Sequence, residues 1–378
     1  MEALLARSIE AFGREEWNVL FPGELEDWFY YHAVENSGIA GFEWIYLAVW
    51  DRGRLRAAVP GFVTDYRLDT TLSGPAKRLA AAITRITPRL LSIPLASLGS
   101  PVGEICHLGF APDCSADEQR MLAGLLMDKL IEFARQRRIG MIAVKDASEA
   151  DDALWSEVCG NAGLRRMPGQ ATALLDLPHR SFEDYLASLG PATRKDMRRK
   201  LRSRAGLRIE WRSDIDDIVD DVMALYRATL AQAEYRFEEL TPAYFTGVLQ
   251  DPHRRAFCVT YWHDRMLIGF NLVLRDGNRL LDKFFGMDYA SGRAHNLYYL
   301  SWMENVRYCI ENGIGRYQSG QGLEHEKQRL GSRLVPNWLW YRHRNRIVDR
   351  VFAAVERVFS LDAAEEASRP VPIVTARA

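Results

Sequence analysis

The chain lacks the features that mark disulfide-stabilised, zinc-binding and membrane-spanning proteins. Its five cysteines are scattered over 378 residues without a C-x-x-C spacing, so we expect reduced thiols and neither a disulfide framework nor a zinc site. The eight histidines form no H-x-x-x-H or Cys/His cluster, and no metal is expected. Apolar runs fall far short of the ~20 residues that span a bilayer. Charged residues interrupt the N-terminal segment, so no signal peptide is expected and the predicted location is cytoplasmic.

The chain also has no excess of charge of either sign. Its formal net charge is -1, which gives no overall attraction to DNA or to an anionic membrane surface, and we expect neither partner. Hydrophobic residues make up 48% of the chain, enough to bury a large core. A length of 378 residues exceeds that of a typical single domain and predicts two domains of similar size.

The first half of the chain alternates strand and helix patterns. A hairpin is predicted from strands at 44–50 and 55–63, and 3.6-residue periodicity predicts a helix at 116–137. This order is typical of an α/β domain, which we place at 1–178. The other elements expected here are helices at 25–35, 76–86 and 151–162, strands at 141–144 and 171–177, and an irregular Gly-, Pro- and Ser-rich segment at 93–109.

A second domain is expected at 179–362, followed by a flexible tail at 363–378. Ser181 is the predicted N-cap of its first helix, and a helix at 185–204 becomes strongly basic in its second half. Because both halves share helices, a hairpin and a strand–helix–strand unit, we suspect an internal duplication. The remaining predicted elements are strands at 208–212, 256–262, 266–274, 279–286, 315–318 and 334–341, and helices at 215–231, 242–249, 296–312, 323–330 and 346–359.

The turn between the strand at 279–286 and the long helix at 296–312 narrows the choice among α/β folds. Its residues 289–294 read Y-A-S-G-R-A, which resembles the Q/R-x-x-G-x-G/A loop of acyl-CoA-binding GNAT proteins. Small residues at a helix N-terminus expose backbone N–H groups that hold a pyrophosphate. Gly292 and Ala294 match the last two positions and Tyr289 replaces the first, so an ordinary turn is the alternative.

A longer resemblance is carried by four segments, 281–288, 296–299, 313–321 and 327–331. Together they are similar to the GNAT branch allied to the Fem-type (FemAB/FemX-like) peptidyltransferases. The resemblance implies two tandem GNAT-like domains, each a mixed, mostly antiparallel sheet flanked by helices. It also implies transfer of an acyl or aminoacyl group to an amine, with the active site in the second domain.

Two residues of the resembling segments are predicted to be catalytic. Lys327 follows a glycine turn after a strand, where a lysine can stabilise an oxyanion or a donor phosphate; a solvated lysine is the alternative. Asp282 lies in an apolar strand, where a desolvated carboxylate can act as the general base for the attacking amine. Asp282 is not expected to pair with Lys283, because neighbours in a strand point to opposite faces.

The remaining candidates are expected to hold the two substrates. The donor phosphates are assigned to Gly292, Arg293, Ala294 and Asn296. The acceptor and the acyl carbonyl are assigned to Gln318, Ser319, Gln321, Tyr298, Tyr299, Glu324 and His325, with helix packing as the alternative for the two tyrosines.

The predicted function is that of a GNAT-type N-acyltransferase without a tightly bound cofactor. An amine of a small molecule or a peptide attacks the donor carbonyl directly, since no G-x-S-x-G or Cys/His signature indicates a covalent intermediate. The donor is an acyl thioester of the acyl-CoA type, with an aminoacyl-tRNA as the alternative. The basic residues at 194–204 either grip phosphates or form a solvated face neutralised by the acidic stretch that follows. A non-catalytic binding module is the alternative of another class.

Overall fold

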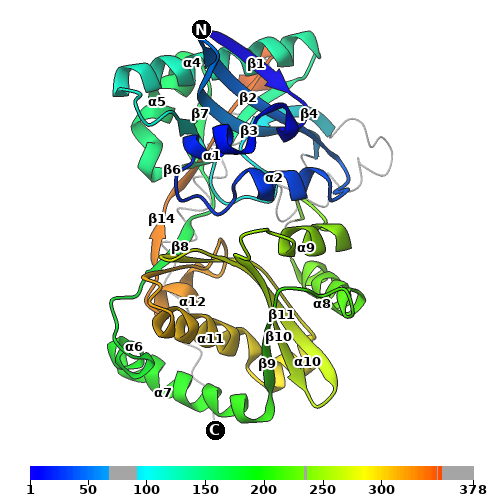
Figure 1. Cartoon of the computed structure of the whole chain (residues 1–378), viewed down its shortest axis with the longest axis vertical. Helices are drawn as coiled ribbons and strands as arrows, with labels where there is room; N and C mark the ends of the chain where they lie inside the picture. The colour runs from blue at the N-terminus through cyan, green and yellow to red at the C-terminus, as the bar shows by residue number, and fades with distance from the viewer. Residues whose placement is uncertain (68–91, 234–235, 347, 351–378) are drawn as a thin grey trace.

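The computed structural model describes residues 1–67, 92–233, 236–346 and 348–350. The predicted helix at 76–86, most of the helix at 346–359 and the tail at 363–378 lie outside the described residues. Figure 1 shows two sheets in separate halves of the molecule, each with helices packed on it. Within the described ranges, no helix is both long and apolar enough to cross a membrane.

The first sheet has the order β1-β2-β3-β4-β6-β15-β7, with the short β5 paired to β3. Only β4 and β6 run parallel in it; the other pairs are antiparallel. Its strands are β1 (Glu2–Ala6), β2 (Phe42–Asp51), β3 (Arg54–Arg67), β4 (Ser92–Leu98), β5 (Gly109–Phe110), β6 (Met141–Ser148), β7 (Arg165–Pro168) and β15 (Asn337–His343). The helices of this half are η1 (Ile9–Ala11), α1 (Arg14–Leu20), α2 (Trp28–Glu35), α4 (Ala116–Gln136), η4 (Glu149–Asp151) and α5 (Asp152–Asn161).

The second sheet has the order β14-β8-β13-β12-β11-β10-β9, and only β12 and β13 run parallel. Its strands are β8 (Thr172–Asp176), β9 (Arg208–Arg212), β10 (Ala256–His263), β11 (Met266–Arg275), β12 (Arg279–Met287), β13 (Arg316–Gln318) and β14 (Arg333–Val335). Its helices are α6 (Phe182–Ser188), α7 (Pro191–Lys200), η5 (Leu201–Gly206), α8 (Val219–Gln232), α9 (Pro242–Leu249), α10 (Tyr289–Ala294), α11 (Leu297–Glu311) and α12 (Glu324–Arg329).

The two sheets have the same plan, which supports the suspected duplication. Each has four strands in antiparallel order, then a parallel fifth, and a last strand at the far edge. In each sheet the strand between the fifth and the last comes from the other half of the chain: β15 enters the first sheet and β8 the second. The predicted fold class, two mixed and mostly antiparallel sheets flanked by helices, is confirmed.

Because the two sheets exchange strands, the predicted domain boundary at residue 178 does not separate one sheet from the other. β8 lies before that boundary but pairs with β13 and β14 of the second sheet. The single strand predicted at 334–341 is divided at Pro336, which has no N–H to donate to a ladder, into β14 of the second sheet and β15 of the first. Similarly, Gly190 and Pro191 divide the helix predicted at 185–204 into α6 and α7.

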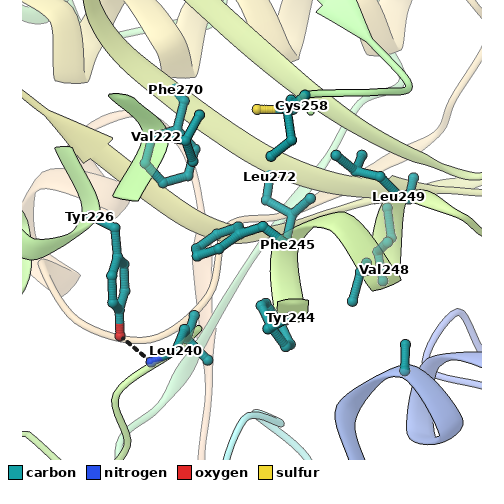
Figure 2. Packing of buried hydrophobic residues seen from close by; sticks show 14 of the residues in the cluster. Val222, Tyr226, Leu240, Tyr244, Phe245, Val248, Leu249, Cys258, Phe270 and Leu272 are labelled. Carbon is teal, nitrogen blue, oxygen red and sulfur yellow. Dashed lines mark hydrogen bonds between the residues drawn. The ribbon is translucent and has the colours of Figure 1, made fainter. Parts of the chain in front are cut away.

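A shared core joins the two halves. One cluster of buried side chains contains Tyr30 and Val34 of α2 together with residues of α8, α9, β10, β11 and β12. Figure 2 labels residues of this cluster that come from the second half of the chain, and the ring of Phe245 on α9 lies near the sheet. The centroid of this ring is 5.5 Å from that of the Phe270 ring. The hydroxyls of Tyr30 and Tyr244 are 3.0 Å apart, so α2 and α9 fix the relative position of the two sheets.

We expect that neither half of the chain folds alone. A fragment of residues 1–178 lacks β15 and leaves β8 without a partner, so it should unfold without a cooperative transition. Mixing it with a fragment of residues 179–378 should restore one. Circular dichroism during heating measures both outcomes, and a cooperative transition of the isolated 1–178 fragment contradicts the expectation.

Candidate active site

The candidate site forms where β12 and β13 separate. The two parallel strands pair only over Arg279–Arg316, Leu280–Tyr317 and Leu281–Gln318, after which β13 ends and β12 continues to Met287. The first residues of β12 beyond the pairing are Asp282 and Lys283. Their side chains point to opposite faces, Asp282 toward α11 and Lys283 toward the first half of the chain, as predicted.

On the α11 face, Asp282 is the centre of a polar network. Its carboxylate accepts hydrogen bonds from Asn271 Nδ2 at 2.5 Å and from the Tyr317 hydroxyl at 2.7 Å. Asn305 of α11 donates to Asn271 Oδ1 at 2.7 Å and lies 3.5 Å from Asp282. Burial raises the pKa of Asp282 above its usual range, against the opposing effect of these donors. The carboxylate is therefore held in place with a reduced tendency to be ionised.

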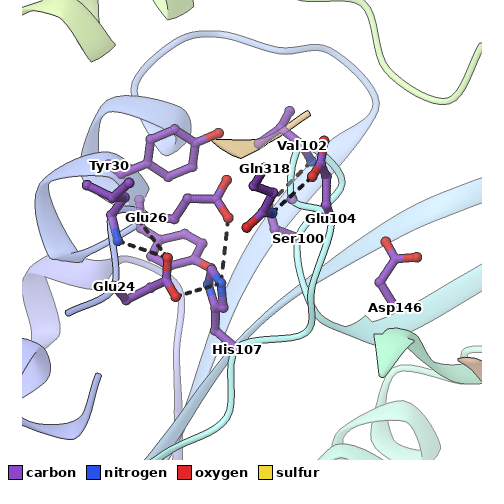
Figure 3. A network of polar contacts seen from close by, with 12 residues as sticks. Glu24, Glu26, Tyr30, Ser100, Val102, Glu104, His107, Asp146 and Gln318 are labelled. Carbon is purple, nitrogen blue, oxygen red and sulfur yellow. Dashed lines mark hydrogen bonds and ion pairs between the residues drawn. The ribbon is translucent and has the colours of Figure 1, made fainter. Parts of the chain in front are cut away.

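On the opposite face, Lys283 forms a buried ion pair with Glu26 and donates to the Val102 carbonyl at 2.8 Å. Burial alone lowers the pKa of the Lys283 ammonium, but the Glu26 carboxylate beside it raises the pKa above its usual range. Figure 3 shows Glu26 and Glu24 around His107, close to Glu104 and Gln318. The face is thus lined by charged side chains of both halves of the chain.

The main residue that the sequence did not reveal is Glu104. Its Oε2 accepts a hydrogen bond from Gln318 Nε2 at 3.1 Å (Figure 3), and its backbone carbonyl accepts from Asn337 at 3.1 Å and Gln321 at 3.4 Å. Burial raises the pKa of Glu104, and the nearby Lys283 ammonium opposes that rise. The only signal in the sequence was a charged residue within the Gly-, Pro- and Ser-rich segment 93–109.

Glu104 lies beside the second domain because the segment that carries it packs where β4 and β6 of the first sheet separate. β4 and β6 pair in parallel as far as Leu98 and Val144, and β6 then continues to Ser148. The chain after β4 returns beside β6, where Cys106 N donates to Asp146 O and Lys145 Nζ to Gly103 O, each at 2.8 Å. In the first sheet, the place beside β6 where the strands separate is occupied by the segment that carries Glu104.

Lys327 is buried and holds the loop that follows β13. Its ammonium donates to the carbonyls of Ser319, Gly320 and Gln321 at 2.6, 2.9 and 3.0 Å. These bonds use all three of its N–H groups. Burial lowers the pKa of Lys327, and the Glu104 and Asp282 carboxylates oppose that shift. The geometry therefore gives Lys327 a positioning role for the loop that carries Gln318 and Gln321.

The other predicted substrate contacts are divided between the site and the surface. Gln321 Nε2 donates to Asp146 at 3.2 Å, and the buried Ser319 hydroxyl has no partner among the described residues. The Tyr298 hydroxyl is buried near Asp282, whereas that of Tyr299 donates to Glu326 at 2.8 Å. Glu324 is exposed and the His325 side chain is 85% exposed, so the structure does not bring these two into the site.

The segment 289–294, predicted as an open phosphate loop, forms the helix α10. Asp288 caps it, accepting a hydrogen bond from Ser291 N at 2.7 Å, and Gly292 N donates to Asp288 O at 2.7 Å. Gly292 lies against Met287, since a Cβ at this position would be 2.7 Å from the sulfur. Arg293 and Ala294 are exposed, and Asn296 donates to Ser203 Oγ at 3.3 Å. The Asp288 carboxylate thus binds the N–H of Ser291, while the N–H groups of Gly292 and Asn296 donate to backbone carbonyls and are not free for a pyrophosphate.

The basic residues at 194–204 are only partly neutralised, and by different acids than predicted. Arg198 pairs with Glu183, Arg199 with Asp196, and Arg204 with Glu304, whereas Asp217 of the acidic stretch pairs with Arg212. Lys195 and Arg202 are exposed. In the part of the chain that the structure describes, no three His, Cys, Asp or Glu side chains are grouped to hold a metal ion.

Comparison with known proteins places the chain in a family. Residues 8–367 match the FemAB-like family, described as peptidoglycan biosynthesis/recognition. No curated protein matches the chain. The chain therefore belongs to the FemAB-like family.

Solved structures show the same fold at low sequence identity. The structure of FemX is 11% identical with a TM-score of 0.58, covering 90% of this chain and 97% of its own. The C-terminal domain of a putative lysylphosphatidylglycerol synthetase from Agrobacterium fabrum is 14% identical with a TM-score of 0.52, covering 89% and 95%. A tandem GNAT protein from the clavulanic acid biosynthesis pathway is 14% identical with a TM-score of 0.50, covering 90% and 98%. The tandem GNAT fold is thereby confirmed.

Two glycines of the loop after β13 offer a matched test of Glu104 placement. Gly320 and Gly322 have φ values of +77° and +76°, but only at Gly320 would an added Cβ collide with the Glu104 carboxylate. Both Gly→Ala changes should destabilise the fold by about 1–2 kcal/mol through backbone strain. Gly320→Ala should also displace Glu104 and lower kcat, while Gly322→Ala should retain kcat. Equal kcat values for the two variants, measured in a transfer assay, contradict this placement.

Proposed function

We propose that the protein transfers an aminoacyl group from an aminoacyl-tRNA to the amine of a peptide. The observation that carries the proposal is the pair of carboxyl groups on the two faces of the gap between β12 and β13. Asp282 lies on the α11 face and Glu104 on the face toward the first domain, and burial raises the pKa of each. Titratable groups perturbed in this way concentrate at functional sites.

We prefer a tRNA donor to an acyl-CoA donor after comparing two candidate phosphate-binding regions of the second domain, the start of α10 and the basic residues of α7 and η5. Asp288 caps the helix where a pyrophosphate would bind, and a carboxylate at that position repels phosphate. By contrast, α7 and η5 carry exposed basic side chains such as Lys195 and Arg202. The end of this segment contacts the start of α11, where Asn296 donates to Ser203 and Lys200 Nζ lies 3.1 Å from the centroid of the Tyr299 ring. An array of exposed cations suits a polynucleotide backbone.

The acceptor is assigned to the face that both domains build. Two of its carboxyl groups, those of Glu104 and Asp146, belong to separate segments that Gln321 Nε2 links by donating to the Glu104 carbonyl and to Asp146, and burial raises the pKa of Glu104. Such groups attract the ammonium form of an amine and can take up a proton from it. The description of the family as acting in peptidoglycan biosynthesis or recognition supports a peptide as the molecule that carries this amine.

The transfer needs one proton acceptor and no covalent enzyme intermediate. The acceptor nitrogen attacks the carbonyl carbon of the aminoacyl ester, a C–N bond forms, and the nitrogen gives a proton to Glu104. The C–O bond to the terminal ribose then breaks, and Glu104 passes this proton to the ribose oxygen, which leaves as a hydroxyl group while the Glu104 carboxylate is restored. Gln318 orients Glu104 through its bond to Oε2 at 3.1 Å, and Lys327 fixes the loop behind it. Positioning and proton transfer together supply the rate enhancement.

Thermal unfolding in the presence of each donor tests the proposal. Aminoacyl-tRNA should raise the Tm, because a ligand at 100 times its Kd stabilises the folded state by about 2.7 kcal/mol, and its affinity should fall steeply with salt. Acetyl-CoA should leave the Tm unchanged. Protection by acetyl-CoA with none by tRNA overturns the choice of donor.

The Glu104→Gln variant links stability to activity. The folded-state pKa of Glu104 is raised. Ionisation of Glu104 therefore destabilises the folded state as the pH rises from about 4.3, the pKa of a solvent-exposed glutamate, to the pKa of Glu104 in the folded state. The neutral glutamine should therefore raise the Tm at pH values above this window, and the gain should vanish below pH ~4. The same change should lower kcat by about 100-fold or more through loss of the proton acceptor. A lower Tm at neutral pH together with unchanged kcat contradicts the assignment.

A further inference from the structure

Several buried polar atoms on the α11 face have no hydrogen-bond partner among the described residues. They include the hydroxyls of Tyr298 and Tyr261 and the Oδ1 of Asn305. Asn305 and Tyr261 are fully buried, where an unsatisfied polar atom costs free energy. Because most buried polar groups in folded proteins are paired, a cluster of unpaired ones indicates that a ligand satisfies them.

Asn305 is the member of this group that contacts Asp282. Asn305 Nδ2 lies 3.5 Å from its carboxylate, and the same Nδ2 donates to Asn271 Oδ1 and to the Tyr317 hydroxyl. Those contacts fix the orientation of the amide, so Oδ1 is the unpaired atom. Tyr298 lies two turns before Asn305 on the same face of α11. Asp282 and Tyr298 are half-buried, so the cluster is open on their side.

The cluster can accept hydrogen bonds, and among the described residues no cation is hydrogen-bonded to it; Lys327 and Lys283 act on Asp282 only through their charge. Asp282 is bonded to neutral groups only, the amides of Asn271 and Asn305 and the Tyr317 hydroxyl. Lys283 points to the opposite face and pairs with Glu26, and the N–H groups of Lys327 are used by loop carbonyls. A buried carboxylate without a hydrogen-bonded cation is costly, and a small ligand cation would compensate it.

We propose that Asp282, Tyr298 and Asn305 bind the α-ammonium group of the donor. An ammonium has three N–H donors and no acceptor, which matches a carboxylate, an amide oxygen and a hydroxyl that can all accept. The proposal rests on the proposed function and adds to it a basis for selecting the donor. Asp282 is then the residue that distinguishes an α-aminoacyl ester from an acyl ester without an amine, whereas Glu104 serves the acceptor on the other face.

The test compares two donors that differ only in the α-substituent. A preparation of tRNA charged with amino acids is divided, and one part is treated with nitrous acid, which converts the α-amino groups to α-hydroxyl groups. Filter binding then gives the Kd of the full-length protein for both forms and for uncharged tRNA. The wild-type protein should bind the aminoacyl form about tenfold more tightly than the hydroxyacyl form, since hydrogen bonds to a charged group are the stronger kind.

Three variants test which residues cause the preference for aminoacyl-tRNA over hydroxyacyl-tRNA. Asp282→Asn should reduce the ratio of the two Kd values to about one. Tyr298→Phe should reduce it about threefold without lowering the Tm, because its hydroxyl has no protein partner to lose. The control Tyr308→Phe lies on the same helix, with its ring stacked on Trp211 at 3.7 Å, and should keep the wild-type ratio.

The outcomes separate this inference from the proposed function. Equal binding of aminoacyl- and hydroxyacyl-tRNA by the wild-type protein overturns the ammonium site and leaves a tRNA donor standing. A preference that survives in both Asp282→Asn and Tyr298→Phe also overturns it. Absence of binding to tRNA in any form overturns the proposed function together with the inference.

Discussion

The reciprocal exchange of β8 and β15 is the constraint on which the candidate site depends. Each sheet contains one strand from the other half of the chain, so the position of one sheet relative to the other is fixed by backbone ladders as well as by side-chain packing. Asn337, the first residue of β15, donates to the Glu104 carbonyl. The strand that completes the first sheet thus also holds the carboxylate that the first domain contributes to the second.

This arrangement places several buried charged side chains between the two sheets. Glu26 and Lys283 neutralise each other, and Arg255 bridges Asp27 and Asp251. Glu104 and Asp282 have no such bonded cation, and burial raises the pKa of both. A protein selected for stability alone would not keep two carboxylates in this state, whereas a site that must take up a proton and bind a cation requires them.

Local sequence patterns predicted most of the fold, because most elements are set by residues close in the chain. The periodicity at 116–137 gave α4, whose Ser115–Glu118 capping box fixes its first turn. The errors fell at Pro336, Pro191 and α10, where one or two residues decide whether an element continues. The destination of β8 and β15 could not be predicted, since it depends on pairing between strands more than a hundred residues apart in the chain.

The same distinction applies to the site. Asp282, Gln318, Gln321 and Lys327 were predicted because they lie within the segments that carry the family resemblance. Glu104 was missed because it meets Gln318 across 214 positions of sequence. Its segment is also the piece of the first domain that fills the gap beside β6. Glu104 comes from one short stretch that crosses to the neighbouring domain, so a graft of that stretch from a relative is expected to change the proposed acceptor face while leaving the α11 face, proposed for the donor, unchanged.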